Sequence, residues 1–177
     1  MRCAEWMGLP NGRVFGTGNI LDTSRFIREI ADYINLNTEV VKGFIVGEHG
    51  DSQIPLWSRV AVAGVPIAEY CENVGLPWNE SIKTMIAERV VRMGAEITSN
   101  KGRTHYGIAT CVCYLADAVL NQRLTIASVA TPLEGEYGVH GVALSVPSII
   151  GVNGVEKRLE EQWRLIVFIG VYAEKTG

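Results

Sequence analysis

The residues best suited to chemistry lie in Gly47-Glu48-His49-Gly50-Asp51, where a histidine stands between two glycines. Imidazole can both give and take a proton near neutral pH, so His49 is a candidate general acid and base. The glycines leave room around the side chain and let a ligand approach the backbone closely. The segment follows an apolar run, residues 41–46, which is predicted to be a strand. These five residues alone fit a turn histidine that bonds to local backbone equally well.

Asp22 and Arg25 form a second candidate group, at the start of a helix predicted over residues 21–34. The helix is indicated by apolar residues at every fourth position, namely Phe26, Ile30 and Ile34. Asp22 suits the first turn, where exposed backbone N–H groups favour negative charge. Arg25 follows three residues later, so both side chains can project from the same side of the helix. Taken alone, the pair is better explained as a capping aspartate with an i,i+3 salt bridge.

A third candidate, Lys101-Gly102-Arg103-Thr104, separates two predicted long helices. The first begins near Asn79, a good N-cap residue, and the second covers residues 104–120. The start of the second helix could bind one edge of a substrate or cofactor, or Thr104 could simply cap it. A fourth segment, Gly16-Thr17-Gly18, is not a dinucleotide fingerprint, because the third glycine that such a fingerprint needs is replaced by Leu21.

The remaining elements that must position these groups are mostly β. We expect a short strand at residues 13–15 after a turn at 10–12, and a hairpin-like segment at 60–67. The last third predicts strands at residues 124–131, 140–146 (ending before Pro147) and 148–151, then a turn at 153–154 and an amphipathic helix over 155–162. Helices followed by antiparallel strands favour an α+β domain.

Composition excludes several classes of protein. The chain has 177 residues, 47% of them hydrophobic, which predicts a single domain over residues 1–177. A net charge of −3 gives no reason to expect nucleic-acid or membrane binding. The longest apolar run, residues 165–173, is too short to cross a bilayer, and the N-terminus has no signal-peptide core. Four cysteines lack zinc or disulfide spacing and are expected to be reduced thiols in the cytoplasm: Cys3, Cys71, Cys111 and Cys113.

Three motifs together resemble the C-terminal, substrate-binding half of the L-lactate/malate dehydrogenase superfamily, on the lactate side. They are Asp22-Thr23-Ser24-Arg25, GEHGDS at residues 47–52 and NKGRT at 100–104, and the resemblance extends over roughly residues 8–162. It implies an α+β fold in which long helices pack on a twisted antiparallel sheet. It also implies NAD as cofactor, a small 2-oxo or 2-hydroxy acid as substrate, and a homo-oligomer.

The resemblance also implies a role for each motif residue. His49 would exchange a proton with the substrate oxygen, Asp22 would orient the imidazole, and Arg25 would clamp the substrate carboxylate with two parallel bonds. Thr104 matches a position that lines the substrate pocket. Ile108 matches the apolar side chain against the nicotinamide ring, and Thr17 matches a position near its carboxamide. Pyruvate and L-lactate are the first choice of substrate pair, and malate-type or 2-hydroxyisocaproate-type activity and a non-catalytic oligomerisation module are the alternatives.

The sequence departs from the family pattern in three respects. It has no βαβ unit, glycine fingerprint or ribose-binding acid, so the Rossmann half and most NAD contacts are expected to be absent, and residues 1–12 resemble a remnant of the interdomain segment. We therefore expect the chain to be inactive, or nearly so, by itself. Ile27 and Lys42 occupy positions that bind a sugar bisphosphate in many bacterial relatives, so activation by that ligand is not expected. Residues 164–177 are apolar and β-branched, unlike the family's charged final helix.

Overall fold

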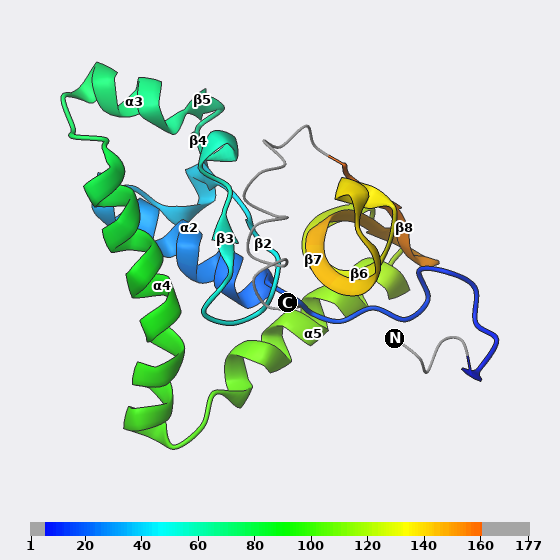
Figure 1. Ribbon diagram of the computed structural model, residues 1–177. Helices are drawn as coiled ribbons and strands as arrows, with labels where there is room; N and C mark the ends of the chain where they lie inside the picture. The colour runs from blue at the N-terminus through cyan, green and yellow to red at the C-terminus, as the bar shows by residue number, and fades with distance from the viewer. Residues whose placement is uncertain (1–5, 161–177) are drawn as a thin grey trace.

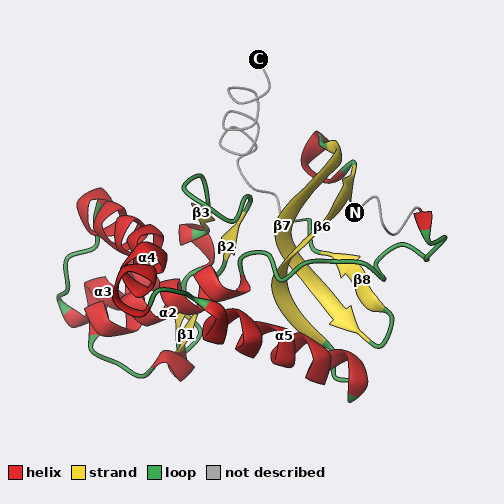
Figure 2. Ribbon diagram, turned by 90° about the horizontal axis from the view of Figure 1, so that it is seen from below, coloured by secondary structure: helices red, strands yellow, loops and turns green. Residues whose placement is uncertain are grey.

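The structure is a computed structural model that describes residues 6–160. Within these residues it has four α-helices, one of which lies at the centre of the molecule. Helix α2 (Ile20–Ile34) lies in the middle, with α3 (Ile67–Val74) and α4 (Glu80–Lys101) on one side and an antiparallel sheet on the other (Figure 1). Helix α5 (His105–Leu120) runs along the bottom of the view in Figure 2, from the helical side to the sheet. The predicted α+β arrangement of long helices and a twisted antiparallel sheet is confirmed.

The main sheet has three antiparallel strands in the order β6-β7-β8, and its centre pairs Val129 with Val146. Its strands are β6 (Thr125–Glu134), β7 (His140–Gly151) and β8 (Gly154–Arg158). Two small sheets lie nearer α2. One contains β1 (Val41–Lys42), β4 (Ala61–Val62) and β5 (Val65–Pro66), and the other contains β2 (Ile45–Val46) and β3 (Ile54–Pro55). Short 3-10 helices cover Thr38–Val40, Trp57–Arg59 and Glu136–Gly138.

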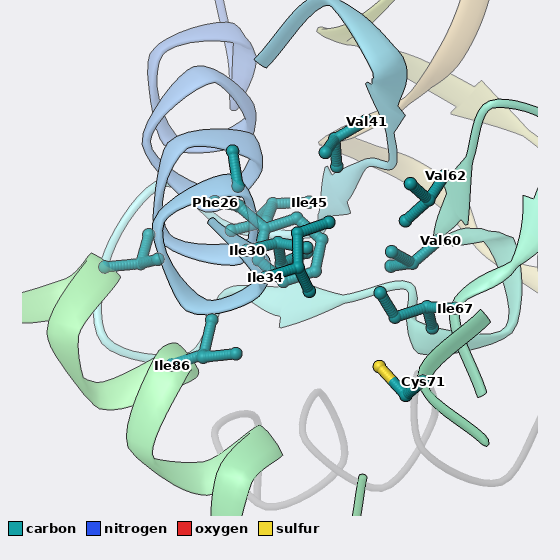
Figure 3. Packing of buried hydrophobic residues seen from close by; sticks show 12 residues of the cluster. Phe26, Ile30, Ile34, Val41, Ile45, Val60, Val62, Ile67, Cys71 and Ile86 are labelled. Carbon is teal, nitrogen blue, oxygen red and sulfur yellow. The ribbon is translucent and has the colours of Figure 1, made fainter. Parts of the chain in front are cut away.

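One face of α2 forms the centre of the larger core. Phe26, Ile30 and Ile34 are buried and point toward the small strands, as Figure 3 shows. The ring of Phe26 meets Trp57 edge-on, with 5.0 Å between ring centroids. A second cluster fills the space between α5 and the main sheet. The periodicity that predicted this helix therefore also identified the face that it buries.

Three of the predicted helices are present: the one over residues 21–34 is α2, the one that begins near Asn79 is α4, and the one over 104–120 is α5. Asn79 caps α4, since its side-chain oxygen accepts a bond from the Ile82 N–H at 3.1 Å. Thr104 stands at the N-cap of α5 but makes no side-chain capping bond. The hairpin expected at residues 60–67 is β4 and β5, and its last residue, Ile67, begins α3, a helix that the sequence did not predict. No helix within residues 6–160 is long and apolar enough to cross a membrane.

The single strand expected over residues 41–46 is wrong, because Gly43 and Phe44 separate β1 from β2, and the two pair in different sheets. The strand expected at residues 13–15 is also wrong. Residues 13–15 form no strand, and an isolated bridge between Gly16 and Ala130 follows them. In both places tertiary pairing determines where the backbone bonds go, and local propensity does not reveal it.

The return strand does not end before Pro147, as the sequence predicted, and β7 continues to Gly151. The carbonyl of Pro147 accepts a bond from the Leu159 N–H at 2.8 Å, on the side of β8. In an antiparallel strand the N–H and C=O of one residue point to the same neighbour, so the missing proline N–H faces the place where β8 ends. The proline therefore removes no ladder bond to β6.

The amphipathic helix expected over residues 155–162 is wrong within the described part of the chain, where residues 154–158 form β8. The Val155 N–H bonds to the Gly12 carbonyl at 2.9 Å, while β8 pairs with β7 on its other edge. Pairing on both edges outweighs a local pattern that fits a helix. The atypical tail at 164–177 and Cys3 lie outside the described residues.

Candidate active site

The loop that carries His49 is fixed to the main sheet. Gly47 exchanges two backbone bonds with Ser145 of β7, each of 2.9 Å, immediately after β2 ends at Val46. Gly47 has a φ of +91°, a conformation that favours glycine, so the chain turns sharply there toward His49. The histidine therefore begins a loop whose base is held by a rigid strand.

The start of α2 is fixed to the same sheet, on the neighbouring strand. Gly16 and Ala130 of β6 are joined by two backbone bonds of 2.8 and 3.1 Å, and the Asn19 N–H donates to the Ser128 carbonyl at 3.1 Å. The Ser128 hydroxyl in turn donates to the Ile45 carbonyl at 2.6 Å. Because β6 and β7 are paired, these bonds place the first turn of α2 beside the loop that carries His49.

Asp22 and His49 form the central contact of the site. His49 Nδ1 lies 2.5 Å from Asp22 Oδ2, although the two residues are 27 positions apart in the sequence. The Asp22 side chain is only 4% exposed, whereas the His49 side chain is 60% exposed. A carboxylate only accepts hydrogen bonds, so Nδ1 carries the proton and Nε2 remains available to a ligand. The pair can therefore hold the imidazole in one tautomer while its reactive nitrogen faces outward.

Arg25 also contacts Asp22, through the i,i+3 salt bridge that the sequence allowed. Its Nη1 lies 3.4 Å from Asp22 Oδ1, and its side chain is 11% exposed. Gly94 of α4 lies beside the guanidinium, since a Cβ built there would be in van der Waals contact with Nη1, at 3.5 Å. The contact with Asp22 occupies Nη1, so the other guanidinium N–H groups can bind a planar carboxylate. The capping-type salt bridge and the functional interpretation are therefore compatible.

These groups open into a single cavity of about 530 Å³. Its lining includes five of the six residues expected to form the site: Asp22, Arg25, His49, Thr104 and Ile108. Thr17 is not among the lining residues. It lies half-buried before α2, where its carbonyl accepts a bond from the Ile20 N–H at 3.2 Å. The structure therefore brings together the acid–base pair, the candidate clamp and an apolar wall, while the roles of these residues stay predictions.

Several lining or contacting residues were not identified from the sequence. Asn19, at the N-cap of α2, donates from Nδ2 to Asp22 Oδ2 at 2.9 Å. Gln53 follows the His49 loop, and Val91, Gly94 and Thr98 belong to α4. The last three recur along one side of that helix, which is a helical spacing, but nothing in the sequence indicates which segment they face.

The charges around the cavity limit what it can bind. Arg25 is the one Lys or Arg side chain among the lining residues, and Asp22 and Asp51 are the acids. A ligand with one carboxylate therefore finds one cationic partner, and a second carboxylate would find none besides a protonated His49. The arrangement can bind a monocarboxylate and exchange a proton with an oxygen next to it.

Within residues 6–160 no cysteine lines this site. Cys111 of α5 faces a different cavity, of about 390 Å³, and burial is the main cause that raises its pKa, with the Asp22 charge adding to the effect. A thiol with a raised pKa stays protonated and unreactive. Ile27 and Lys42 line the same second cavity, where Lys42 is the single charged residue among the lining residues.

The chain is similar to proteins of known function. A family model described as lactate/malate dehydrogenase, alpha/beta C-terminal domain, matches residues 20–163. The L-lactate dehydrogenase of Thermoanaerobacter sp. (strain X514) is 40% identical over 153 residues, which are 86% of this chain and 49% of that protein. The chain thus spans about half the length of the curated relatives it matches.

Solved structures agree with the sequence matches. The crystal structure of minor L-lactate dehydrogenase from Enterococcus mundtii in the ligands-bound form gives a TM-score of 0.89 at 36% identity, covering 98% of this chain and 56% of that chain. Lactate dehydrogenase from Eimeria maxima, solved with NADH and oxamate, gives a TM-score of 0.88 at 28% identity over 98% of this chain and 55% of that chain.

Proposed function

The chain belongs to the lactate/malate dehydrogenase family, whose C-terminal domain it matches, and we propose that it supplies the substrate-binding and catalytic half of an NAD-dependent L-lactate dehydrogenase. The observation that carries this proposal is the Asp22–His49 contact of 2.5 Å in the same cavity as Arg25. Proton exchange beside a bound carboxylate is what the interconversion of pyruvate and L-lactate requires of the protein.

In this proposal each residue acts at a stated atom. Arg25 binds the carboxylate of pyruvate and holds its C2 carbonyl near His49. The protonated imidazole gives its Nε2 proton to the carbonyl oxygen during reduction, and takes that proton back during oxidation of lactate. Asp22 stabilises the protonated imidazole and fixes Nδ1 as the nitrogen that points away from the substrate. Thr104 and Ile108 line the same cavity.

Ile108 is the residue of this cavity that would contact NAD in the proposed enzyme. When bound, the reduced cofactor would supply the hydride for C2 of the substrate. Ile108 is apolar, 39% exposed and in the same cavity as His49, so it offers a surface for the nicotinamide ring. Within residues 6–160 no parallel strands form a βαβ unit that could bind the rest of a dinucleotide. Thr17 is the weaker assignment, because it does not line the cavity.

The charge of the cavity supports pyruvate over oxaloacetate. The second carboxylate of oxaloacetate would meet no additional Lys or Arg among the described lining residues, and Asp51 would repel it. Bulkier 2-oxo acids such as 2-oxoisocaproate also carry a single carboxylate, so they remain candidate substrates.

The proposal predicts that the 177-residue chain binds oxamate, a pyruvate-like monocarboxylate, and by itself turns over no pyruvate. Oxamate should shift NMR signals of cavity residues. NADH absorbance should stay constant with pyruvate, oxaloacetate or 2-oxoisocaproate, and should fall with pyruvate once the N-terminal half of the Thermoanaerobacter relative is added. A chain that neither binds oxamate nor complements that half would instead be a non-catalytic oligomerisation module. Faster turnover of another acid would reassign the substrate.

We further propose that the chain forms a homo-oligomer. Apolar side chains are exposed on α5, in the connection that follows it and at the start of β6: Val112, Leu120, Leu124 and Ile126. Covering such a surface favours association. We expect the wild-type chain to sediment faster than a 19.4 kDa monomer, and Leu120→Lys/Leu124→Lys to sediment as a monomer with unchanged circular dichroism. A wild-type chain that sediments as a monomer at every concentration would refute the proposal.

We also propose a cytoplasmic location. Cys71, Cys111 and Cys113 are free thiols, and none of these three forms a disulfide. Free thiols are typical of proteins kept in a reducing compartment.

A further inference from the structure

Asn19 occupies a helix-capping position but does not act as a cap. It is the N-cap residue of α2 and is fully buried, yet its side chain makes no bond to the exposed backbone N–H groups of the first turn. An N-cap asparagine normally uses its side-chain oxygen to accept such a bond. Asn79 does so at the start of α4. The capping preference therefore does not explain why an asparagine stands at position 19.

The amide nitrogen of Asn19 makes two bonds instead. Nδ2 donates to Asp22 Oδ2 at 2.9 Å and to the Glu48 carbonyl oxygen at 3.2 Å. A carboxylate and a carbonyl both only accept, so the amide must turn its nitrogen toward them. Its Oδ1 is buried and has no hydrogen-bond partner among the described residues. Leaving a buried acceptor unpaired costs free energy, so the favourable contribution of this side chain comes from its donor.

The two acceptors belong to the two segments that carry the acid–base pair. Asp22 Oδ2 is the same oxygen that meets His49 Nδ1, and Glu48 is the residue immediately before His49. We propose that Asn19 is a positioning residue of the Asp22–His49 pair, tying the carboxylate of α2 to the backbone of the His49 loop. This inference rests on the proposed function, because it assigns Asn19 a part in the same proton transfer.

The exposure of His49 makes such positioning necessary. Its side chain is 60% exposed, so packing restrains the ring only weakly, and the hydrogen bond to Asp22 must set its orientation. The charged residues that line the cavity together with His49 are Asp22 and Arg25 of α2 and Asp51 of the His49 loop. The residues that α4 and α5 contribute to the cavity are uncharged. Asn19 joins the backbone of this loop to the Asp22 carboxylate through its two side-chain bonds.

The proposal is tested by the tautomer of the neutral His49 ring in the full 177-residue chain, read from its ¹⁵N NMR shifts. Wild-type His49 should carry its proton mainly on Nδ1. Asn19→Leu keeps a similar volume and removes the donor, and it should raise the ratio of the Nε2–H to the Nδ1–H tautomer about two- to tenfold. Asn19→Ser places one hydroxyl donor on a shorter side chain and should give an intermediate ratio of the two tautomers. Asn79→Leu is the matched control, since it removes a true cap and should lower thermal stability without changing the His49 ratio.

Unchanged His49 tautomers in Asn19→Leu would overturn the proposal, as would an equal change in Asn79→Leu. If Asn19→Leu does not fold, an unchanged ratio in Asn19→Ser would overturn it. The readout needs neither cofactor nor turnover, so it is separate from the proposed function. A wild-type chain that does not bind oxamate would refute the proposed function. The tautomer ratio of His49 would still decide whether Asn19 positions the Asp22–His49 pair.

Discussion

Arg25→Lys is expected to weaken oxamate binding at least about thirtyfold, which corresponds to about 2 kcal/mol. Lysine keeps the positive charge but cannot form two parallel bonds to a carboxylate. Arg25 is only 11% exposed, so water can replace the lost bond only poorly. Isothermal titration of the chain with oxamate measures the change.

Arg28→Lys on the same helix is the matched control for this measurement. Arg28 is 65% exposed and pairs with Asp32 at 2.8 Å, on a part of α2 that does not line the cavity. The exchange of arginine for lysine there should leave oxamate binding unchanged. Equal weakening by the two substitutions would mean that oxamate responds to overall charge or helix stability, and it would remove Arg25 from the proposed clamp.

Much of the fold could be predicted because its helices are long and regularly patterned. The spacing of Phe26, Ile30 and Ile34 identified both α2 and its buried face, and Asn79 marked the first turn of α4. The errors occur where distant backbone segments pair. The Val155 N–H meets Gly12, far away in the sequence, and no local pattern around residue 155 reveals that bond. Pro147 is tolerated inside β7 because of where β8 ends, which is also a property of the assembled sheet.

The candidate site could be predicted from the sequence only in part, for the same reason. Asp22 and Arg25 are three residues apart, so their salt bridge could be predicted, but it also explained the pair without any function. The contact that changes this interpretation joins Asp22 to His49, 27 residues later. Only the resemblance of the two motifs to a known family linked them before the structure did. Asn19 was missed because an asparagine before a helix is normally a cap, and its bonds to Asp22 and Glu48 depend on the folded loop.

The two sides of α2 have different roles: one carries residues of the proposed active site, and the other packs in the core and stabilises the fold. Asp22 and Arg25 face the cavity, while Phe26 and Ile30 are buried in the core against the small strands (Figure 3). The orientation of the cavity side is therefore set by how firmly the opposite side packs. A loss of packing should reduce stability first and ligand binding as a consequence.

Phe26→Ala is accordingly expected to lower the free energy of unfolding by about 3–5 kcal/mol. The phenyl ring is fully buried and meets Trp57 edge-on, so its removal leaves a cavity that the surrounding strands cannot close. Urea denaturation followed by circular dichroism measures the loss, with Tyr106→Ala, 75% exposed on α5, as the aromatic control expected to change stability by less than about 1 kcal/mol. A loss of under about 1 kcal/mol for Phe26→Ala would contradict the central place of α2 in the core. Because a domain of this size has only about 5–15 kcal/mol of stability, the substitution should also weaken oxamate binding at moderate temperature, when part of the chain is unfolded.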